Sequence, residues 1–412
     1  MSEAREFRLQ NGLTVVHEYT PHTQVLSVQA WIKTGSVNED AKNNGISHFL
    51  EHILFKGTAN YAPDEIDAIV DAHGGRMNAG TSKDYTMYYI TLPVEHAAVA
   101  ADVIADMIFN ATFDANEIEK EKPVVVQEIQ RKFDNPTYDM WQDAAADLYA
   151  GTPYAMEIIG TEENVNSFTP KMLKDYYASH YHPKNTTLIL TGDISEAEAR
   201  KLAEAHFSQE AKVAAASGYS NKWKPADIKQ EAKIYEKEVA QDYLLAAYRV
   251  PATAPDAPVY EVLTEILAGG EYSLLNQELK YSQGLVTAVS AGDMLSKNSG
   301  AYIFYLVTNP DDSEKALSEL QKLLASFVKE GPSDQELEKA KNRLTSRTIF
   351  TKERASSLAQ EIGYSYTLDI KDYYHTYNDR IRSITAADIR KIAKLFTTEA
   401  LIYKTIPESP NR

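Results

Sequence analysis

Histidine and glutamate residues in one short apolar segment have the spacing of a metal site. The segment Ser47 to Thr58 contains an H-x-x-E-H pattern, formed by His48, Glu51 and His52, among residues compatible with a helix. On a helix, residues four apart project from the same face, so the two imidazoles converge. Two converging neutral imidazoles supply half of a tetrahedral zinc site. Glu51 leans toward the same face, where a general base for a zinc-activated water belongs.

The alternative is an amphipathic helix that carries two structural histidines, one partly buried and one solvated. The remaining eight histidines lack ligand spacing with a carboxylate on one face, and we expect them to be structural or exposed.

Two carboxylates farther along the chain have helical spacing. Glu121 and Glu128 are seven residues apart, which is two helical turns, so they share a face. Pro123 lies between them and cannot occupy a regular helix interior without penalty. We therefore expect a kink or a break at Pro123. The alternative for both carboxylates is a solvated helix face.

The composition is that of a large globular protein. The chain has 412 residues, of which 43% are hydrophobic and 25% charged, and this length suggests two or more domains. Its formal charge of −17 argues against nucleic acid or anionic lipid as the main partner, because both need clustered Lys and Arg. The chain has no cysteine, so a metal site would have to use histidine and carboxylate ligands.

Neither a secretory signal nor a membrane span is visible in the sequence, which leads us to expect a cytoplasmic protein.

Alternating strand and helix patterns must position these residues. The helix that carries the H-x-x-E-H pattern is expected to begin near Ser47, a plausible N-cap. Asn11-Gly12 between two β-rich runs predicts a hairpin over residues 7–18. The other expected elements are the strands Val25–Ile32, Arg76–Ala79 and Tyr85–Leu92 and the helices Glu65–Ala72 and Val94–Phe109.

The same order of elements recurs in the second half. A strand over Tyr243–Arg249 and a helix over Val259–Leu267 take the places of the third strand and of the H-x-x-E-H helix. The segment from Ser167 matches the segment from Ser383 position by position, and a buried strand follows each. We therefore predict an α+β fold of two tandem homologous domains, each a mixed, mostly antiparallel sheet packed against helices. The expected boundaries are 1–212 for the N-terminal domain, 213–230 for a linker and 231–412 for a C-terminal domain without a metal.

The motifs together resemble those of the M16 peptidase family, the inverzincins. The resemblance rests on His48-Phe49-Leu50-Glu51-His52, on Asn78-Ala79-Gly80-Thr81 and on the run from Glu121 to Glu128, in this order. It covers nearly the whole chain and is similar to the short form found in dimeric members such as the mitochondrial processing peptidase β subunit. The resemblance implies two domains that close as a clam-shell in the dimer.

The resemblance also implies residue roles and a cofactor. His48, His52 and Glu128 would bind one Zn²⁺ per chain, Glu51 would be the catalytic base, and Glu121 would support the site from behind. Asn78 and Ala79 would lie on an edge strand that pairs with an extended peptide substrate. For Asn78 the alternative is a residue that only flanks a turn. The implied activity is that of a zinc metalloendopeptidase.

One departure from the family pattern concerns the second half. Lys280 stands where the family has an Arg that contacts substrate, and Thr287 stands seven residues later, where the family has a Tyr. Lys cannot make the forked contact of Arg, and Thr is too short to replace a phenol. These substitutions favour a heterodimer with a related chain that supplies Arg and Tyr over a self-sufficient homodimer. A non-catalytic structural subunit and a hydrolase of non-peptide substrates are the remaining alternatives.

Overall fold

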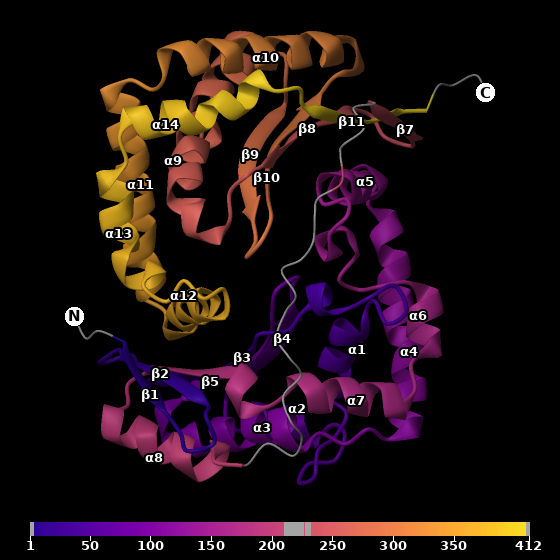
Figure 1. Ribbon diagram of the computed structural model, residues 1–412, viewed down its shortest axis with the longest axis vertical. Coiled ribbons are helices and arrows are strands. Elements are labelled where there is room, and N and C mark those ends of the chain that lie inside the picture. The colour runs from indigo at the N-terminus through magenta and orange to yellow at the C-terminus, as the bar shows by residue number, and fades with distance from the viewer. Residues whose placement is uncertain (1–3, 210–225, 227–231, 409–412) are drawn as a thin grey trace. The chain divides into compact units, whose positions relative to one another are not determined.

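Two β-sheets, one in each half of the chain, form the framework of the protein. The computed structural model describes residues 4–209, 226 and 232–408 (Figure 1). The first sheet has the strand order β1-β2-β6-β3-β5-β4, and the second has the order β7-β11-β8-β10-β9. The first is built from β1 (Arg5–Arg8), β2 (Thr14–Tyr19), β3 (Val25–Ile32), β4 (Arg76–Thr81), β5 (Thr86–Pro93) and β6 (Thr186–Gly192). The second is built from β7 (Lys233–Lys237), β8 (Asp242–Val250), β9 (Ala288–Leu295), β10 (Gly300–Thr308) and β11 (Leu401–Pro407).

The second sheet repeats the topology of the first. Without the edge strand β1, the five strands of each sheet follow the same spatial order when each half is numbered along the chain. In each sheet one pair is parallel, β2 with β6 and β7 with β11, and the other pairs are antiparallel. This repeat confirms the predicted α+β fold of two related tandem domains. The closing of two such domains as a clam-shell in a dimer stays a prediction.

Fourteen α-helices accompany the sheets in the part of the chain that the structure describes. Those before the second sheet are α1 (Ile46–Ile53), α2 (Glu65–Ala72), α3 (Ala97–Asn110), α4 (Ala115–Arg131), α5 (Tyr138–Leu148), α6 (Glu162–Ser167), α7 (Pro170–His180) and α8 (Glu196–Phe207). Those that follow are α9 (Ala257–Ala268), α10 (Ser313–Glu330), α11 (Asp334–Lys352), α12 (Ala355–Thr367), α13 (Tyr373–Ser383) and α14 (Ala386–Ala393). No helix among the described residues is long and apolar enough to cross a membrane.

The first sheet buries both of its faces. Along β2 and β6, side chains alternate between the faces, so Val15 and Leu188 enter the main core while Val16 and Ile189 enter a smaller one. The apolar side of α1 also packs in the main core. The smaller core is completed by α12, which packs on β3 and β6.

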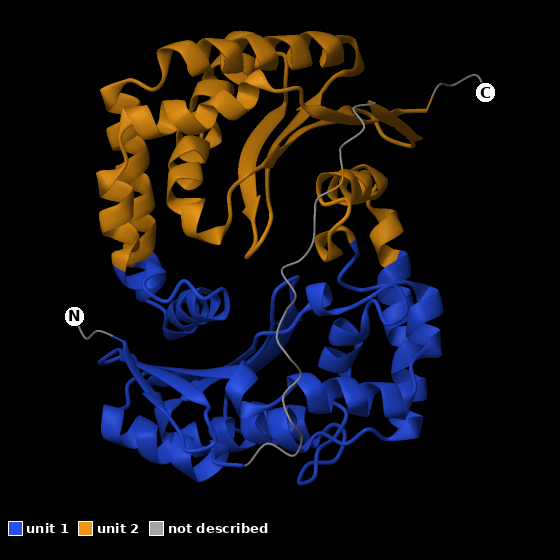
Figure 2. Ribbon diagram, viewed as in Figure 1, with its two compact units in different colours: residues 1–130, 156–220, 350–375 blue, residues 131–155, 221–349, 376–412 orange. Residues whose placement is uncertain are grey.

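Each of the two compact units contains one helix from the other half of the sequence. One unit comprises residues 1–130, 156–220 and 350–375, and the other comprises residues 131–155, 221–349 and 376–412 (Figure 2). Thus α12, from the second half of the sequence, packs on the first sheet, and α5, from the first half, packs on β8 and β11 of the second sheet. The compact units are therefore discontinuous in sequence, and the boundaries 1–212 and 231–412 stay a prediction. Apart from Ala226, the predicted linker 213–230 lies outside the described residues.

Two local predictions need correction. The N-cap of α1 is Gly45 and not Ser47, because Gly45 adopts φ +95° and Ile46 is already helical. The helix α4 runs through Pro123 without a break. Pro123 and Glu119 are exposed, so solvent can satisfy the Glu119 carbonyl that loses its helical hydrogen bond.

The contact between α12 and the first sheet leaves no room for a side chain at Gly363. A Cβ on Gly363 would lie 2.2 Å from Cε2 and Nε1 of Trp31. We expect Gly363→Val to lower the free energy of unfolding by about 1–3 kcal/mol, because overpacking forces the ring or the helix to move. Urea unfolding followed by circular dichroism measures the change. Ser357→Val, at a less buried position of the same helix, is the control and should change it by less than about 0.5 kcal/mol.

Candidate metal centre

The helix α1 presents its apolar side to the core and its polar side to the site. Ile46, Phe49, Leu50 and Ile53 are buried, whereas the side chains of the H-x-x-E-H pattern are half-buried on the other side. The rings of His48 and His52 lie with their centroids 4.8 Å apart. The predicted helix thus brings both imidazoles to one face.

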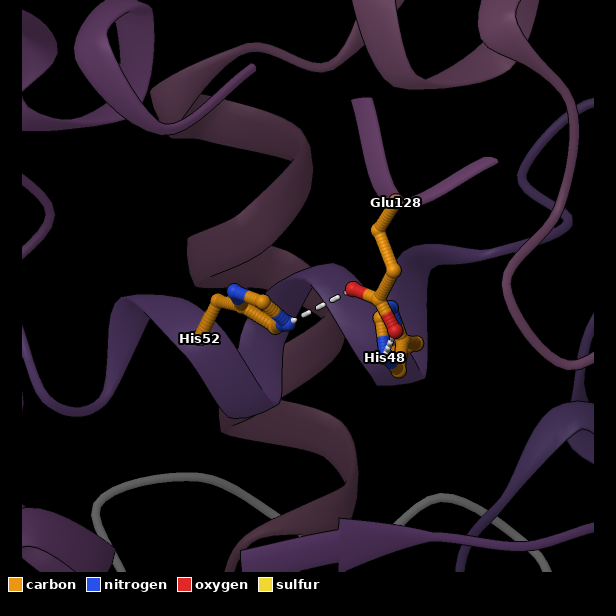
Figure 3. Close-up of side chains that lie close together, drawn as sticks. All are labelled: His48, His52 and Glu128. Atoms are coloured by element: carbon orange, nitrogen blue, oxygen red, sulfur yellow. Dashed lines mark ion pairs between the residues drawn. The ribbon is translucent and has the colours of Figure 1, made fainter. Parts of the chain in front are cut away.

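A carboxylate from α4 lies against both imidazoles. Glu128 Oε1 is 3.6 Å from His48 Nε2, and Glu128 Oε2 is 3.5 Å from His52 Nε2 (Figure 3). One ligand atom from each of the three residues lies within 4.8 Å of the others. Within the described residues, this is the one group of three or more such side chains.

The donor set and its spacing fit a zinc ion. Ligand atoms about 2.0–2.1 Å from a tetrahedral ion lie about 3.4 Å from one another. The two nitrogen–oxygen distances, 3.5 and 3.6 Å, are close to this separation. Two imidazoles and one carboxylate are also the ligand set of catalytic zinc sites that leave the fourth position for water or substrate.

The second carboxylate of α4 holds His52 from behind. Glu121 is buried, and its Oε1 lies 2.9 Å from His52 Nδ1. Its Oε2 lies 3.0 Å from Lys56 Nζ. Burial alone would raise the pKa of Glu121, but the hydrogen bonds with His52 and Lys56 outweigh it and lower this pKa. Glu121 is therefore a buried carboxylate with two cationic or polar partners.

The two imidazoles have opposite electrostatic surroundings. Burial, together with the neighbouring His52, lowers the pKa of His48. Burial would also lower the pKa of His52, but hydrogen bonds with Glu121 and Glu128 raise it overall. His48 is thus kept in the neutral form that can bind a metal, and His52 gains electron density from its carboxylate partners.

Glu51 is fixed by a residue at the end of β4. Its Oε2 accepts a hydrogen bond of 2.5 Å from the Thr81 hydroxyl. Burial raises the pKa of Glu51, while the bond from Thr81 and the charge of His52 oppose the rise. The carboxylate is thereby held beside the two histidines and not free to rotate into solvent.

Comparison with known sequence families identifies both halves of the chain. The family described as insulinase (peptidase family M16) matches residues 14–162, and the peptidase M16 inactive domain matches residues 167–344. The chain belongs to the M16 peptidase family. The metal-ligand group lies within the first match, which agrees with a first M16 domain that carries the site and a second that does not.

Full-length relatives support this assignment. The "uncharacterized zinc protease YmxG" of Bacillus subtilis is 30% identical over 99% of both chains. The mitochondrial-processing peptidase subunit beta of Lentinula edodes is 28% identical, over 94% of this chain and 86% of that one. The crystal structure of a protease from Helicobacter pylori has the same fold, with a TM-score of 0.90 and 24% identity over 99% of this chain and 100% of that chain.

The predicted substrate residues of the M16 peptidase lie on an edge strand. β4 is the last strand of the first sheet, and its one partner within the described residues is β5, where Asn78 is paired with Tyr89 and Ala79 with Tyr88. Asn78 is exposed, and its Oδ1 accepts a hydrogen bond from the Ala79 N–H at 2.9 Å. α1 packs beside β4, so this edge strand lies next to the metal-ligand helix.

The two weaker candidates belong to the second compact unit. Lys280 lies in the π-helical turn Asn276–Ser282, with its Nζ 5.5 Å from the centroid of the Tyr281 ring. Thr287 is exposed, and its hydroxyl lies 3.2 Å from Gln241 Nε2 and from the Val307 carbonyl. Their roles as substrate contacts stay predictions.

Two contacts of the site were missing from the sequence-based prediction. Lys56 follows His52 by four residues, a spacing that could have pointed to a shared partner. Thr81 belongs to the prediction only as the last residue of the motif Asn78-Ala79-Gly80-Thr81. No sequence signal links it to Glu51, because the contact depends on how β4 and α1 pack.

Glu121→Gln tests the support of His52. An amide keeps the shape of the side chain but is a weaker acceptor, so we expect the affinity for Zn²⁺ to fall about 10–100-fold. Competition with a chromophoric chelator measures the dissociation constant. Glu117→Gln, one turn earlier on α4 and paired with Lys120, is the matched control and should leave the affinity unchanged. Equal affinities for Glu121→Gln and wild type would contradict the expected role.

Proposed function

We propose that this M16 peptidase is a zinc-dependent endopeptidase that hydrolyses short or unfolded peptides. The observation that carries the proposal is the convergence of His48, His52 and Glu128 beside a Glu51 carboxylate that is itself held by Thr81. Three ligands, an adjacent base and an open strand edge are the parts that metal-assisted hydrolysis of an extended peptide requires.

In this proposal the three ligands hold one Zn²⁺ per chain. When bound, the ion supplies Lewis-acid chemistry, lowering the pKa of a water and polarising a peptide carbonyl. Glu121 keeps the His52 ring oriented through Nδ1, which leaves Nε2 directed toward Glu128. The fixed tautomer is the contribution of Glu121 to the reaction.

Glu51 moves the proton. Its carboxylate takes a proton from the water that attacks the scissile carbonyl and returns it to the nitrogen of the leaving amine. The raised pKa of Glu51 suits the first step, because a stronger base accepts the proton more readily. Between the two proton transfers, the hydrogen bond from the Thr81 hydroxyl limits the motion of the Glu51 carboxylate.

The substrate binds as an added strand along β4. The outer edge of β4 has no strand partner among the described residues and can donate and accept the backbone hydrogen bonds of an extended peptide. Asn78 and Ala79 lie in the middle of this strand. A folded segment cannot align its backbone with a sheet edge, so the substrate must be extended. This requirement favours short or unfolded peptides, which we propose are bound in an enclosed chamber.

A related partner chain completes the active enzyme in this proposal. Lys280 and Thr287 replace the family's Arg and Tyr, and one relative is named as a subunit of a processing peptidase. We infer a heterodimer in which this chain provides the metal site and the partner provides Arg and Tyr. A self-sufficient homodimer is the alternative.

Glu51→Gln tests the catalytic base. The amide cannot accept the proton, so we expect kcat to fall by about 10²–10⁴-fold while Zn²⁺ binding stays within about threefold of wild type. Cleavage of a quenched fluorescent peptide by the zinc-loaded chain, with its partner where one is required, measures the rate. Glu65→Gln, on the exposed start of α2, is the control. A Glu51→Gln variant with wild-type kcat would contradict the proposed mechanism.

Lys280→Arg with Thr287→Tyr tests the need for a partner. We expect the purified wild-type chain to bind Zn²⁺ but to cleave peptides far below about 1 s⁻¹, and the double variant to gain at least about tenfold in kcat/KM. Size-exclusion chromatography with light scattering reports the assembly. If the wild-type chain alone turns over at about 1 s⁻¹ or faster, the heterodimer is wrong and the homodimer is favoured.

A further inference from the structure

A carboxylate outside the predicted site holds the beginning of the metal-ligand helix. Glu39 lies in the loop before α1 and is buried, with 6% of its surface exposed. Its Oε1 accepts a hydrogen bond of 2.8 Å from the Ser47 N–H. Its Oε2 accepts bonds from the Gly45 N–H at 2.8 Å and from Asn44 Nδ2 at 3.0 Å. Both oxygens are therefore used by the segment that leads into His48.

The helix cannot provide this cap from its own N-cap position. Gly45 has φ +95°, and a Cβ there would lie 2.5 Å from the Ile159 carbonyl oxygen. No Ser, Thr or Asp fits such a position, so α1 has no side-chain cap of its own. The carboxylate six residues upstream takes over that function by accepting the Ser47 N–H of the first turn.

The Glu39 loop is also tied to the strand that holds Glu51. The Ser36 N–H donates to the Ser82 carbonyl at 3.2 Å, and the Val37 N–H donates to the Lys83 carbonyl at 3.0 Å. Ser82 follows Thr81, whose hydroxyl holds Glu51. One loop thus fixes both the first turn of α1 and the end of β4.

A third segment closes the same cluster. Asn44 Nδ2 donates to the Glu157 carbonyl at 2.7 Å as well as to Glu39. The Lys83 ammonium donates to the Met156 carbonyl. Glu39 therefore lies among three chain segments that surround the start of the metal-ligand helix.

We propose that Glu39 is a positioning residue that sets the rotation and position of α1 and, through them, the directions of His48 and Glu51. The inference rests on the proposed zinc peptidase function and adds a residue that acts on the site through the helix backbone. A rotation of α1 moves both residues relative to Glu128 and Thr81, which belong to other elements. Loss of the cap would therefore weaken the ligand geometry without removing a ligand.

Glu39→Gln is the sharpest test, because it replaces the oxygen that accepts from the Ser47 N–H with a group that donates. The amide oxygen can still accept from Gly45 and Asn44, but the NH₂ group then faces the Ser47 N–H as a second donor. We expect the dissociation constant for Zn²⁺ to rise about tenfold. We also expect the visible absorption bands of the Co²⁺-substituted chain to shift or lose intensity, and kcat to fall about tenfold or more with KM within about threefold.

Glu18→Gln is the matched control. Glu18 is another buried carboxylate of the same unit, and it pairs with Tyr374 and not with the site. We expect this variant to lose stability but to keep the Co²⁺ spectrum and the Zn²⁺ affinity of wild type. If Glu39→Gln does not fold, Glu39→Asp, which keeps the charge but draws the carboxylate back by one methylene, is measured in the same way.

The outcomes separate this inference from the proposed function. A folded Glu39 variant with the spectrum and metal affinity of Glu18→Gln would overturn the positioning role alone. A wild-type chain that binds neither Zn²⁺ nor Co²⁺ would overturn the proposed function and this inference with it. If wild type binds metal but cleaves no peptide, the peptidase assignment fails, and a changed Co²⁺ spectrum in Glu39→Gln still supports the role of Glu39.

Discussion

The site depends on a hydrogen bond between two helices, in which His52 Nδ1 on α1 donates to the Glu121 carboxylate on α4. A buried carboxylate without partners would be unfavourable by several kcal/mol, and here His52 and Lys56 offset that loss. Because both partners belong to α1 and the turn after it, the bond fixes the register of the two helices. That register brings Glu128, two turns farther along α4, within 3.6 Å of both imidazoles.

The second half of the chain shows what the same helix position becomes without a metal site. α9 follows β8 as α1 follows β3, and it packs against the edge strand β9 as α1 packs against β4. It has no histidine, and its buried Glu265 pairs with Arg343 and Arg347. Each half thus has a buried carboxylate with polar or cationic partners, but Glu121 lies on α4 and binds His52 and Lys56, whereas Glu265 lies on α9 itself. Because α9 has no histidine, it lacks the two imidazole ligands that α1 supplies to the metal-ligand group.

Features that depend on local residue spacing could be predicted from the sequence. Features that depend on contacts between distant segments could not. The hairpin, the helix of residues 65–72 and the repeated strand order follow from turn residues and apolar periodicity, and the structure contains them. The pairing of both histidines with one carboxylate follows from helical spacing together with the family resemblance. The exchange of α5 and α12 is invisible to periodicity, because an apolar helix face does not reveal which sheet it covers. The predicted N-cap at Ser47 is wrong because a serine before a helix is a common signal, whereas the true N-cap needs a glycine: Gly45 has φ +95°, and a Cβ there would lie 2.5 Å from the Ile159 carbonyl oxygen.

The two histidine rings are oriented by different physical means. The Nδ1 of His52 is bound to a carboxylate, which fixes the tautomer and raises the electron density at Nε2. The Nδ1 of His48 is buried and has no hydrogen-bond partner among the described residues, so packing and the backbone of α1 determine where this ring points. Burial keeps His48 neutral, but it supplies no directional restraint of the kind that Glu121 gives His52. The direction of His48 therefore depends on the position of the first turn of α1, where Glu39 binds the neighbouring Ser47 N–H. A change at the start of this helix should accordingly disturb His48 more than His52, which its carboxylate partner holds in place.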